Sequence, residues 1–374
     1  MIRILHILSS LDGGGVESLL YSYYKNMDRN KFRFDFAILD KKIGKMEPMF
    51  QKLGTTIYRL PPKREGLIKS LKVLDSIMKE NRYDIVHSHQ NMNAIFAMFI
   101  AFKNRIPVRI AHSHYGNIPH AQFLEKQSIR FFLRPFLKMV STHRFACSKS
   151  AAISLWGKFG SKDVTILYNA IDLKNFVYDE KKRETSRKIF DVTDKFVIGC
   201  VARLNPQKNL LFLLNIVKQL SIENSDVKLI IVGDGEQRGE VEEYIIKNNL
   251  EDLVILLGNR NDVSDIIKCF DVFVLPSAFE GLGIVFIEAQ AVGIYTLASD
   301  KVPQDTNITD LISYLSIDDE KIWVEKIREL MKREKNDCKN NKKKYNELIK
   351  EAHYDIACES RRLEQLYTSF VEGA

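Results

Sequence analysis

One unbroken run of the chain reads as a strand, an open loop and a helix: Val272-Phe-Val-Leu-Pro-Ser-Ala-Phe-Glu-Gly-Leu-Gly-Ile-Val-Phe-Ile-Glu-Ala-Gln-Ala-Val292. The run begins with four apolar residues, Val272–Leu275, which suit a buried strand of a parallel sheet. Two glycines, Gly281 and Gly283, keep the loop open before the apolar helix Ile284–Val292 begins. A strand followed by a loop and a helix is the repeating unit of an α/β fold.

The same alternation of short apolar strands and longer amphipathic helices extends in both directions, interrupted by the charged stretch 179–194. Before this stretch, strands are expected at 2–8, 34–39, 56–60, 85–87, 108–111, 144–146 and 164–167. After it, they are expected at 196–201, 228–232, 254–257, 272–275 and 295–298, and the chain from about residue 320 onward looks helical. The pattern predicts two Rossmann-like, doubly wound parallel-sheet domains.

A length of 374 residues is comfortable for two such domains. We expect the first domain at 1–175 and the second at 176–352, with a C-terminal helix of about 353–374 packing back on the first. The stretch 179–194 reads as a linker or a peripheral helix. Ligands of doubly wound folds bind at the carboxyl ends of the strands, so the two domains are expected to face each other across a cleft.

The net charge of +8 favours anionic partners such as phosphates, anionic lipid or nucleic acid. No helix-turn-helix, zinc or stacking-aromatic signature supports nucleic-acid binding, so that partner is not expected. The five cysteines lack CxxC or histidine spacing, which indicates neither a disulfide framework nor a zinc site. The apolar stretch 94–102 is about half as long as a bilayer span. We therefore expect a soluble, cytoplasmic chain.

A glycine-rich turn, Leu11-Asp-Gly-Gly-Gly-Val-Glu-Ser18, follows the first strand and opens a helix. Glycines let backbone N–H groups approach a ligand closely, and a helix N-terminus favours negative charge. Gly14 and Gly15 are therefore candidates for contact with an anionic ligand, although a plain tight turn explains the same residues.

Two histidine pairs, His87-Ser-His89 and His112-Ser-His114, follow neighbouring strands. Such pairs can suggest a metal, but no Asp or Cys stands close by to complete a site, so none is expected. Polar residues at the ends of neighbouring parallel strands instead line a common site, where a histidine can orient or deprotonate a hydroxyl. A structural hydrogen-bonding role is the alternative for each histidine.

Two cations and two carboxylates stand at strand-to-helix corners of the second domain. Arg203 and Lys208 flank a proline-bearing turn and can clamp a diphosphate, although solvated cations are the common alternative. Glu280 and Glu288 gather at the corner after 272–275, where a carboxylate can accept hydrogen bonds from sugar or ribose hydroxyls. Paired acids are also typical of glycoside hydrolysis, but a hydrolase has no phosphate for the cations to neutralise.

In this order of motifs the chain resembles glycosyltransferase family 4, a large family of retaining enzymes with the two-domain GT-B fold. The likeness runs through nearly the whole length, and the variant His112-Ser-His114 is similar to the branch that builds capsular and exopolysaccharides. The motifs that carry it are Gly14-Gly15-Val16-Glu17, Asp84-Ile-Val-His-Ser-His89, Asn169-Ala-Ile-Asp172 with Phe176, Arg203 with Pro206-Gln-Lys208, Gly233-Asp-Gly235, and the pair Glu280 and Glu288.

The resemblance implies that the second domain binds a nucleotide-sugar donor. Arg203 and Lys208 would hold its diphosphate and stabilise the leaving group. Glu288 would bind the ribose hydroxyls, and Glu280 would hold the transferred sugar. The other implied donor contacts are Asn259 and Arg260 beside the base, and Gly281, Leu282 and Gly283 beside the sugar. The family often has proline where Gly283 stands.

The resemblance also implies that the first domain binds the acceptor. Gly14 and Gly15 would approach the donor phosphates and sugar. His114 would lie beside the anomeric centre and the acceptor hydroxyl, with His112 as the alternative catalytic histidine. The implied reaction moves a hexose or N-acetylhexosamine from a nucleotide-diphosphate sugar, UDP-sugar favoured, to a lipid-linked or growing polysaccharide acceptor, with retention and without a metal or cofactor.

Two other functions stay open at this stage. A GT-B protein can free or isomerise a sugar nucleotide, as an epimerase or hydrolase, without glycosylating an acceptor. The alternative outside enzymes is a basic nucleic-acid-binding protein, which the pI of about 9.0 suggests.

The segment 129–140 is basic, aromatic and apolar. It reads either as a core helix kinked at Pro135 or as a peripheral contact with the anionic inner face of the cell membrane. In the second reading, Arg130, Arg134 and Lys138 would meet the lipid.

Overall fold

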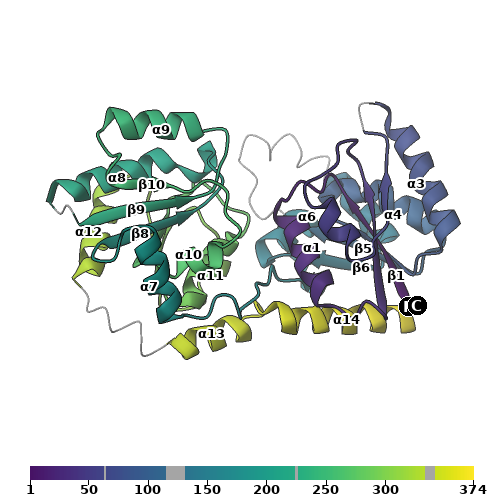
Figure 1. Cartoon of the computed structure of the whole chain (residues 1–374). Helices are drawn as coiled ribbons and strands as arrows, with labels where there is room; N and C mark the ends of the chain where they lie inside the picture. Colours follow the sequence, from purple (N-terminus) through teal and green to yellow (C-terminus); the bar gives the residue numbers. More distant parts are fainter. Residues whose placement is uncertain (63–64, 115–130, 224–225, 333–341) are drawn as a thin grey trace. The chain divides into compact units, whose positions relative to one another are not determined.

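The computed structural model describes residues 1–62, 65–114, 131–223, 226–332 and 342–374. The chain divides into two compact units, each an α/β unit with its own parallel sheet (Figure 1). Unit 1 comprises Met1–Ala170 and Asp355–Ala374, and unit 2 comprises Ile171–Tyr354. The predicted class, two doubly wound α/β domains, is confirmed.

Unit 1 contains a seven-stranded sheet in the order β3-β2-β1-β4-β5-β6-β7, with every pairing parallel. The order reverses between β1 and β4, which makes this the switch point where doubly wound folds bind ligands. The strands are β1 (Ile2–Leu8), β2 (Phe32–Ile38), β3 (Ile57–Arg59), β4 (Ile85–Ser88), β5 (Val108–Ser113), β6 (His143–Ala146) and β7 (Thr165–Ile166).

Helices cover both faces of this sheet. On one face, α1 (Gly15–Asn26), α2 (Glu47–Gln51) and α14 (Ile356–Glu372) contribute to a core rich in aromatic side chains. On the other face, α3 (Leu67–Asn81), α4 (Ala94–Lys103), the helical segment 131–140 and α6 (Lys149–Gly160) bury mostly aliphatic side chains. Because α14 packs against α1, the C-terminal helix is part of unit 1 although unit 2 precedes it in the chain.

Unit 2 repeats the arrangement with six parallel strands in the order β10-β9-β8-β11-β12-β13. Its switch point therefore lies between β8 and β11. The strands are β8 (Phe196–Val201), β9 (Val227–Val232), β10 (Val254–Leu256), β11 (Val272–Leu275), β12 (Tyr295–Ser299) and β13 (Ile312–Leu315). The helices are α7 (Glu180–Ile189), α8 (Leu210–Glu223), α9 (Arg238–Lys247), α10 (Val263–Ile267), α11 (Ile284–Val292), α12 (Glu320–Met331) and α13 (Lys342–Glu351).

The charged stretch 179–194 contains a helix of unit 2, α7. Asp179 caps it, since its side chain accepts a hydrogen bond from the backbone N–H of Lys182 at 3.1 Å. Arg183 and Arg187 both pair with Asp271, which directly precedes β11. The buried ion pairs fasten α7 to the sheet, so the peripheral-helix reading of this stretch is correct.

Among the described residues, no helix combines the length and apolarity that crossing a bilayer demands.

Candidate active site

The switch point of unit 2 brings together three of the residues predicted to bind a donor. Arg203 and Lys208 follow β8, and Glu280 follows β11, the strand that pairs with β8. Carboxyl ends of neighbouring parallel strands meet at one edge of a sheet. The geometry therefore gathers two cations and a carboxylate where a doubly wound fold binds its ligand.

Lys208 and Glu280 form a direct ion pair, with 2.5 Å between Lys208 Nζ and Glu280 Oε1. The hydroxyl of Ser277 donates to the same carboxylate oxygen at 2.6 Å. Gln207 ties the two loops together, since its side-chain amide donates to the carbonyl of Phe279 at 2.8 Å. Glu280 is buried, with 6% of its surface exposed, so its carboxylate depends on these partners.

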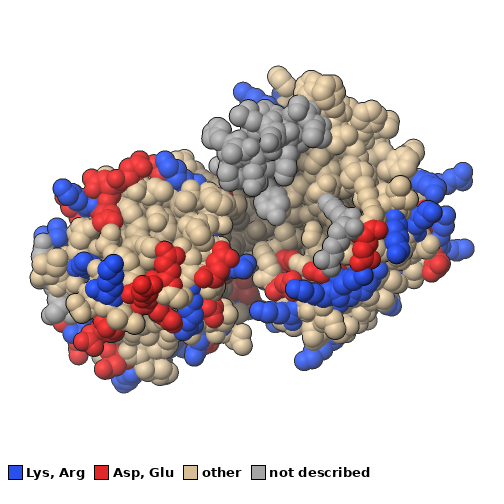
Figure 2. Space-filling view, turned by 90° about the horizontal axis from the view of Figure 1, so that it is seen from above, with Lys and Arg blue, Asp and Glu red and all other residues tan. Residues whose placement is uncertain are grey.

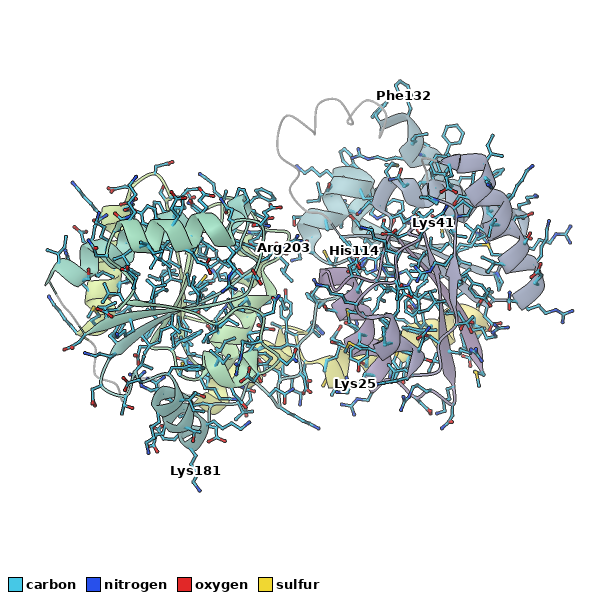
Figure 3. All side chains as sticks on the ribbon, turned by 45° about the horizontal axis from the view of Figure 1, so that its top comes forward. Lys25, Lys41, His114, Phe132, Lys181 and Arg203 are labelled. Atoms are coloured by element: carbon cyan, nitrogen blue, oxygen red, sulfur yellow. The ribbon has the colours of Figure 1, made fainter. Side chains whose placement is uncertain are left out.

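Arg203 is exposed and has no ion-pair partner among the residues that the structure describes. It lies in the loop between β8 and the short helix Pro206–Lys208, and Figure 3 labels it. One cation of the pair is therefore held in place while the other is free to meet an anion.

Glu288 lies in α11, within the second turn. Burial raises the pKa of its carboxyl group from the usual 4.5 to about 7. Among the described residues it has no hydrogen-bond or ion-pair partner, in contrast to Glu280. Such a carboxyl group is available to accept hydrogen bonds from the hydroxyl groups of a ligand.

Gly283 caps the N-terminus of α11 with a left-handed backbone, φ +80° and ψ +62°. Proline cannot adopt this conformation, because its ring fixes φ near −65°. The departure from the proline of the family pattern therefore coincides with a different backbone in the loop. Leu282 buries its side chain and Gly281 has none, so both offer a ligand backbone groups.

The loop predicted to contact the base, Asn259 with Arg260, follows β10 and is exposed. Arg260 forms a two-pronged ion pair with Asp262, at 2.8 Å from Nε and 2.7 Å from a terminal nitrogen. The guanidinium of Arg260 is therefore already paired with a carboxylate, so Asn259 is the more available side chain for hydrogen bonds to a ligand.

The Gly233-Asp-Gly235 motif lets two loops of unit 2 cross. A Cβ on Gly233 would lie 1.8 Å from the carbonyl oxygen of Ala202, and one on Gly235 would lie 2.2 Å from that of Leu204. These carbonyls belong to the loop that carries Arg203. The glycines therefore set the path of the loop that presents the predicted phosphate-binding cation.

In unit 1, α1 begins at Gly15 with Gly14 as its N-cap and no side-chain cap. The carboxylate of Glu17 would lie 2.6 Å from a Cβ placed on Gly14, whereas a Cβ on Gly15 meets nothing within 4 Å. There is therefore open space beside Gly15, whereas the carboxylate of Glu17 lies close to Gly14.

The predicted histidines gather on the α14 face of the unit 1 sheet, joined by one that the sequence analysis missed. His6 lies in β1 beside His87 of β4 in the strand register. Its Nδ1 is 3.0 Å from Nε2 of His89, and Nδ1 of His89 is 2.9 Å from Nε2 of His114. Three imidazoles thus form a chain from the buried interior to His114, which is partly exposed.

A second chain runs beside the first. The hydroxyl of Tyr367, on α14, lies 2.8 Å from Nδ1 of His87, and Nε2 of His87 lies 3.1 Å from Nδ1 of His112. His112 is fully buried, whereas His114 reaches the surface. Of the two candidate catalytic histidines, His114 is therefore the one that a substrate can reach.

All five imidazoles are neutral at ordinary pH. Burial, reinforced by neighbouring imidazoles, holds the pKa values of His87, His89 and His112 well below the usual 6.5. Burial lowers the pKa values of His6 and His114 to about 3. His114 is therefore suited to accept or donate a hydrogen bond as a neutral ring rather than to act as a cation.

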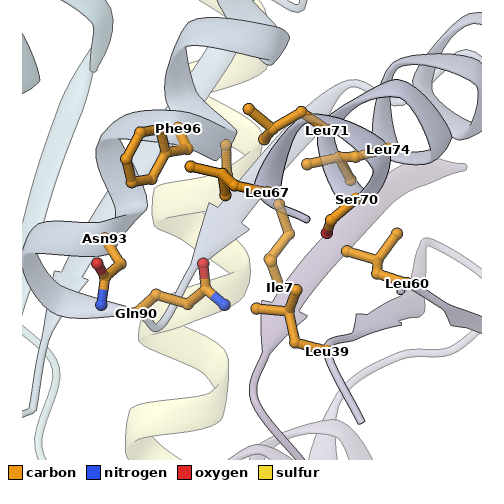
Figure 4. Close-up of a pocket in the computed structure, with 11 residues that line it drawn as sticks. Ile7, Leu39, Leu60, Leu67, Ser70, Leu71, Leu74, Gln90, Asn93 and Phe96 are labelled. Carbon is orange, nitrogen blue, oxygen red and sulfur yellow. The ribbon is translucent and has the colours of Figure 1, made fainter. Parts of the chain in front are cut away.

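A separate apolar pocket lies on the opposite face of the unit 1 sheet (Figure 4). It is lined by Ile7, Leu39, Leu60, Leu67, Ser70, Leu71, Leu74, Gln90, Asn93, Phe96 and Ala97. Ile7 and His6 are consecutive residues of one strand, so their side chains point to opposite faces. The pocket is therefore distinct from the histidine cluster.

Two families match the chain, one for each unit. Residues 13–175 match the family described as Glycosyltransferase Family 4, and residues 181–352 match the one described as Glycosyl transferases group 1. The first match covers β2 to β7 and the second covers β8 to β13, and each includes the predicted site residues of its unit.

Relatives of known name cover most of the chain. It is 29% identical over 332 residues to the putative glycosyltransferase EpsF of Bacillus subtilis, covering 87% of this chain and 86% of that protein. It is 31% identical over 314 residues to UDP-Gal:alpha-D-GlcNAc-diphosphoundecaprenol alpha-1,3-galactosyltransferase of Escherichia coli, covering 80% and 79%. Identity to the capsular polysaccharide biosynthesis glycosyltransferase CapH of Staphylococcus aureus is 25%, covering 99% of each.

Among solved structures, Anabaena HepE in complex with UDP superposes with a TM-score of 0.80 at 18% identity, covering 99% of this chain and 100% of that one. At this identity the likeness establishes the fold, which is the two-domain GT-B architecture. The matched families and the extent of the sequence relatives establish the rest: the chain is a glycosyltransferase and belongs to family 4.

Proposed function

We propose that this chain is a retaining glycosyltransferase that moves a hexose or N-acetylhexosamine from a nucleotide-diphosphate sugar to a lipid-linked or growing polysaccharide acceptor, in the synthesis of capsule, exopolysaccharide or another cell-surface glycan. The observation that supports donor binding is the Lys208–Glu280 ion pair at the switch point of unit 2, beside Arg203, for which the described part of the chain offers no ion-pair partner. A UDP-sugar is favoured because the E. coli relative is named for UDP-Gal and HepE was solved with UDP.

The proposed roles follow from charge. A donor diphosphate carries negative charge that increases on the leaving group as the glycosidic bond to the nucleotide breaks, and Arg203 with Lys208 can neutralise it. When Lys208 turns to the diphosphate, Glu280 loses its ion-pair partner and accepts hydrogen bonds from the sugar hydroxyls instead. Because two cations supply the charge, transfer is proposed to need no metal and no other cofactor.

The other proposed donor contacts lie after β10 and β11, at the same edge of the unit 2 sheet. Glu288 is proposed to accept hydrogen bonds from the ribose hydroxyls, since none of the described residues is a partner of its carboxyl group. The backbone around Gly281, Leu282 and Gly283 is proposed to hold the sugar, and Asn259 with Arg260 to border the base.

In unit 1, His114 is proposed to hydrogen-bond the acceptor hydroxyl, because it is the accessible end of the imidazole chain. Gly15, with open space around it, and Gly14 are proposed to approach the donor. The acceptor is proposed to be linked to a lipid diphosphate, as the name of the E. coli relative states for its own substrate.

The donor site can be tested by thermal shift and transfer. UDP and GDP are each titrated into the protein and into Lys208→Ala, Glu280→Gln and Glu288→Ala variants, followed by transfer from the stabilising donor to a lipid-linked acceptor. The three variants should stay folded and lose the ligand-induced rise in Tm. The matched control is Lys326→Ala, since Lys326 is an ion-paired lysine of the same unit, on α12. Normal donor stabilisation in the Lys208 and Glu288 variants would contradict the site.

The same assay separates the rival functions. Sugar-nucleotide epimerisation or hydrolysis would give product without any acceptor, whereas transfer requires one. A nucleic-acid-binding protein would be stabilised by an oligonucleotide rather than by UDP.

A membrane contact is proposed for an exposed aromatic face of unit 1. The segment 131–140 exposes Phe131, Phe132 and Phe136, and α4 exposes Phe99 and Phe102. Figure 3 labels Phe132 at the edge of the unit, and Figure 2 shows a broad surface of unit 1 with few charged side chains beside the grey residues. Exposed aromatics of this kind enter the interface of a bilayer.

Arg109 joins the two halves of this face. Its guanidinium lies 5.5 Å from the ring centre of Phe102, and its Nε donates to the carbonyl of Val140 at 2.7 Å. Arg109 therefore links the C-terminal ends of α4 and of the segment 131–140, the two helices that carry the exposed aromatic side chains. This surface supports peripheral association with the inner face of the cell membrane, where a lipid-linked acceptor resides.

The cations expected to meet the lipid need a correction. Arg134 donates to the carbonyls of Leu155 and Ser154, both at 2.9 Å, so it fastens the segment 131–140 to α6 rather than facing lipid. Arg130 lies outside the described residues. Lys138 is exposed, and its contact with lipid stays a proposal.

Co-sedimentation with anionic liposomes tests the membrane contact. Phe132→Ser with Phe136→Ser should weaken binding strongly, and Lys138→Glu should weaken it at low salt only. The matched control is Ile246→Ser, which removes an exposed apolar side chain from unit 2. Equal partitioning of the double variant and the control would reject this contact.

A further inference from the structure

The histidine cluster of unit 1 has the ligand spacing of a transition-metal site. One ring nitrogen from each of His89, His112 and His114 lies within 4.8 Å of the other two. In a tetrahedral zinc site with Zn–N bonds of about 2.0–2.1 Å, the nitrogens lie about 3.3–3.4 Å apart. Nδ1 of His89 and Nε2 of His114 lie 2.9 Å apart in a hydrogen bond, which the ion replaces once the proton of His114 moves to its other ring nitrogen. We propose that these three side chains bind one Zn²⁺ ion, with water as fourth ligand, and that the bound ion blocks sugar transfer.

His112 supplies a lone pair that nothing else in the described structure uses. Its Nε2 is buried and has no hydrogen-bond partner among the described residues. Its Nδ1 lies 3.1 Å from Nε2 of His87, whose Nδ1 lies 2.8 Å from the hydroxyl of Tyr367. A buried acceptor without a partner is tolerated better than a buried N–H without one. His112 therefore keeps its proton on Nδ1, donates it to His87 and presents a bare Nε2.

His89 has an equivalent outer partner. Its Nε2 lies 3.0 Å from Nδ1 of His6, so His89 can donate Nε2–H to His6 and turn a bare Nδ1 toward the ion. Metal-binding histidines usually donate their second ring nitrogen in this way, which fixes the tautomer and the ring orientation. Two of the three ligands thus have a built outer shell, His6 on one side and His87 with Tyr367 on the other.

Access selects this set of histidines over the second one. His6, His87 and His89 also cluster, but all three are buried and none reaches the surface. His114 is partly exposed and gives the ion an entry. The inhibition rests on the proposed function, since a zinc ion on His114 withdraws the group that is proposed to meet the acceptor. The binding itself does not depend on it.

Cobalt(II) reports the site without any assay of activity. Protein made without a polyhistidine tag is treated with EDTA, dialysed and titrated with Co²⁺, then with Zn²⁺. We expect one Co²⁺ per chain with the intense visible absorption of tetrahedral coordination, abolished by one equivalent of Zn²⁺. His112→Phe and His114→Asn should each remove this absorption. His87→Phe, which alters an outer partner, should weaken zinc affinity about 10–100-fold.

The matched control is His353→Asn, because His353 is exposed in unit 2 and asparagine tolerates its φ of +70°. This variant should keep the absorption. Only the weak absorption of octahedral cobalt, or full binding by both ligand variants, would overturn the site. If His112→Phe fails to fold, the partly exposed His114→Asn decides the question.

The inhibition has its own readout. Stoichiometric Zn²⁺ should suppress transfer and EDTA should restore it, whereas tetrahedral binding with undiminished transfer would overturn the inhibitory part. Absence of transfer under every condition would count against the proposed function and would leave the cobalt spectrum as it is.

Discussion

Replacing Glu288 by glutamine is expected to remove a pH dependence from unit 2. Burial raises the pKa of this carboxyl group from 4.5 to about 7, so the folded state binds the proton more tightly than the unfolded state. The stability that this preference contributes is complete below pH 4.5 and is lost as the pH rises toward and past 7. A shift of about 2.5 pKa units at about 1.4 kcal/mol per unit corresponds to roughly 3 kcal/mol.

Urea unfolding at pH 5 and pH 8 measures this effect. The free energy of unfolding of the wild type should fall by about 2–3 kcal/mol more than that of Glu288→Gln over this interval. Glu243→Gln, which changes an exposed carboxylate on α9, serves as the matched control and should follow the wild type. Equal losses in the wild type and in Glu288→Gln would refute the assignment of the raised pKa to Glu288.

The same carboxyl should make donor affinity depend on pH with the opposite sign. Ribose hydroxyls donate to the ionised form, so UDP binding should release a proton from Glu288 and strengthen as the pH rises through 7. If only the ionised form binds, the affinity at pH 8 should exceed that at pH 6 about tenfold. Calorimetry in two buffers of different ionisation enthalpy counts the proton. No proton release by the wild type would contradict the proposed ribose contact.

Three further substitutions test contacts in the interior of a single unit. Gly235→Ala would place a Cβ 2.2 Å from a backbone carbonyl oxygen, so it should lower the urea midpoint by an amount equivalent to about 1–3 kcal/mol. Asp271→Asn would leave Arg187, whose side chain is 7% exposed, without its charged partner, and should cost about 3–5 kcal/mol in the same measurement. Tyr367→Phe would delete the hydrogen bond to His87 and should lower stability by about 1 kcal/mol without changing the far-UV circular dichroism.

The strands could be predicted because they are buried on both faces and therefore read as apolar runs. Ile2–Leu8 and Phe196–Val201 begin and end at the predicted residues. The strand Ile312–Leu315 was not among the strands predicted for the second domain, so that prediction was incomplete. Within the described strands it pairs on one side only, with β12, and its four residues include serine and tyrosine. Four residues of mixed polarity are too few to show the period of an edge strand.

The site was harder to predict because contacts across the sheet decide it. His6 stands in an apolar run and looks like a core residue, and only the register that places it beside His87 shows its part in the cluster. The ion pair of Lys208 with Glu280 joins loops from two strands, so spacing along the chain cannot show it. Arg134 matched the composition of a lipid contact, but its hydrogen bonds to backbone carbonyls give it a structural role.

The position of α14 bears on how this chain folds during synthesis. Unit 1 lacks Tyr367, the partner of His87, and part of its aromatic core until α14 has been made. All of unit 2 is translated in between, which at about 5–20 residues per second takes roughly 10–40 s. For that interval the apolar side chains of α1 that later pack against α14 are uncovered in the nascent chain, where a chaperone can bind, and this core is completed only after α14 has been synthesised.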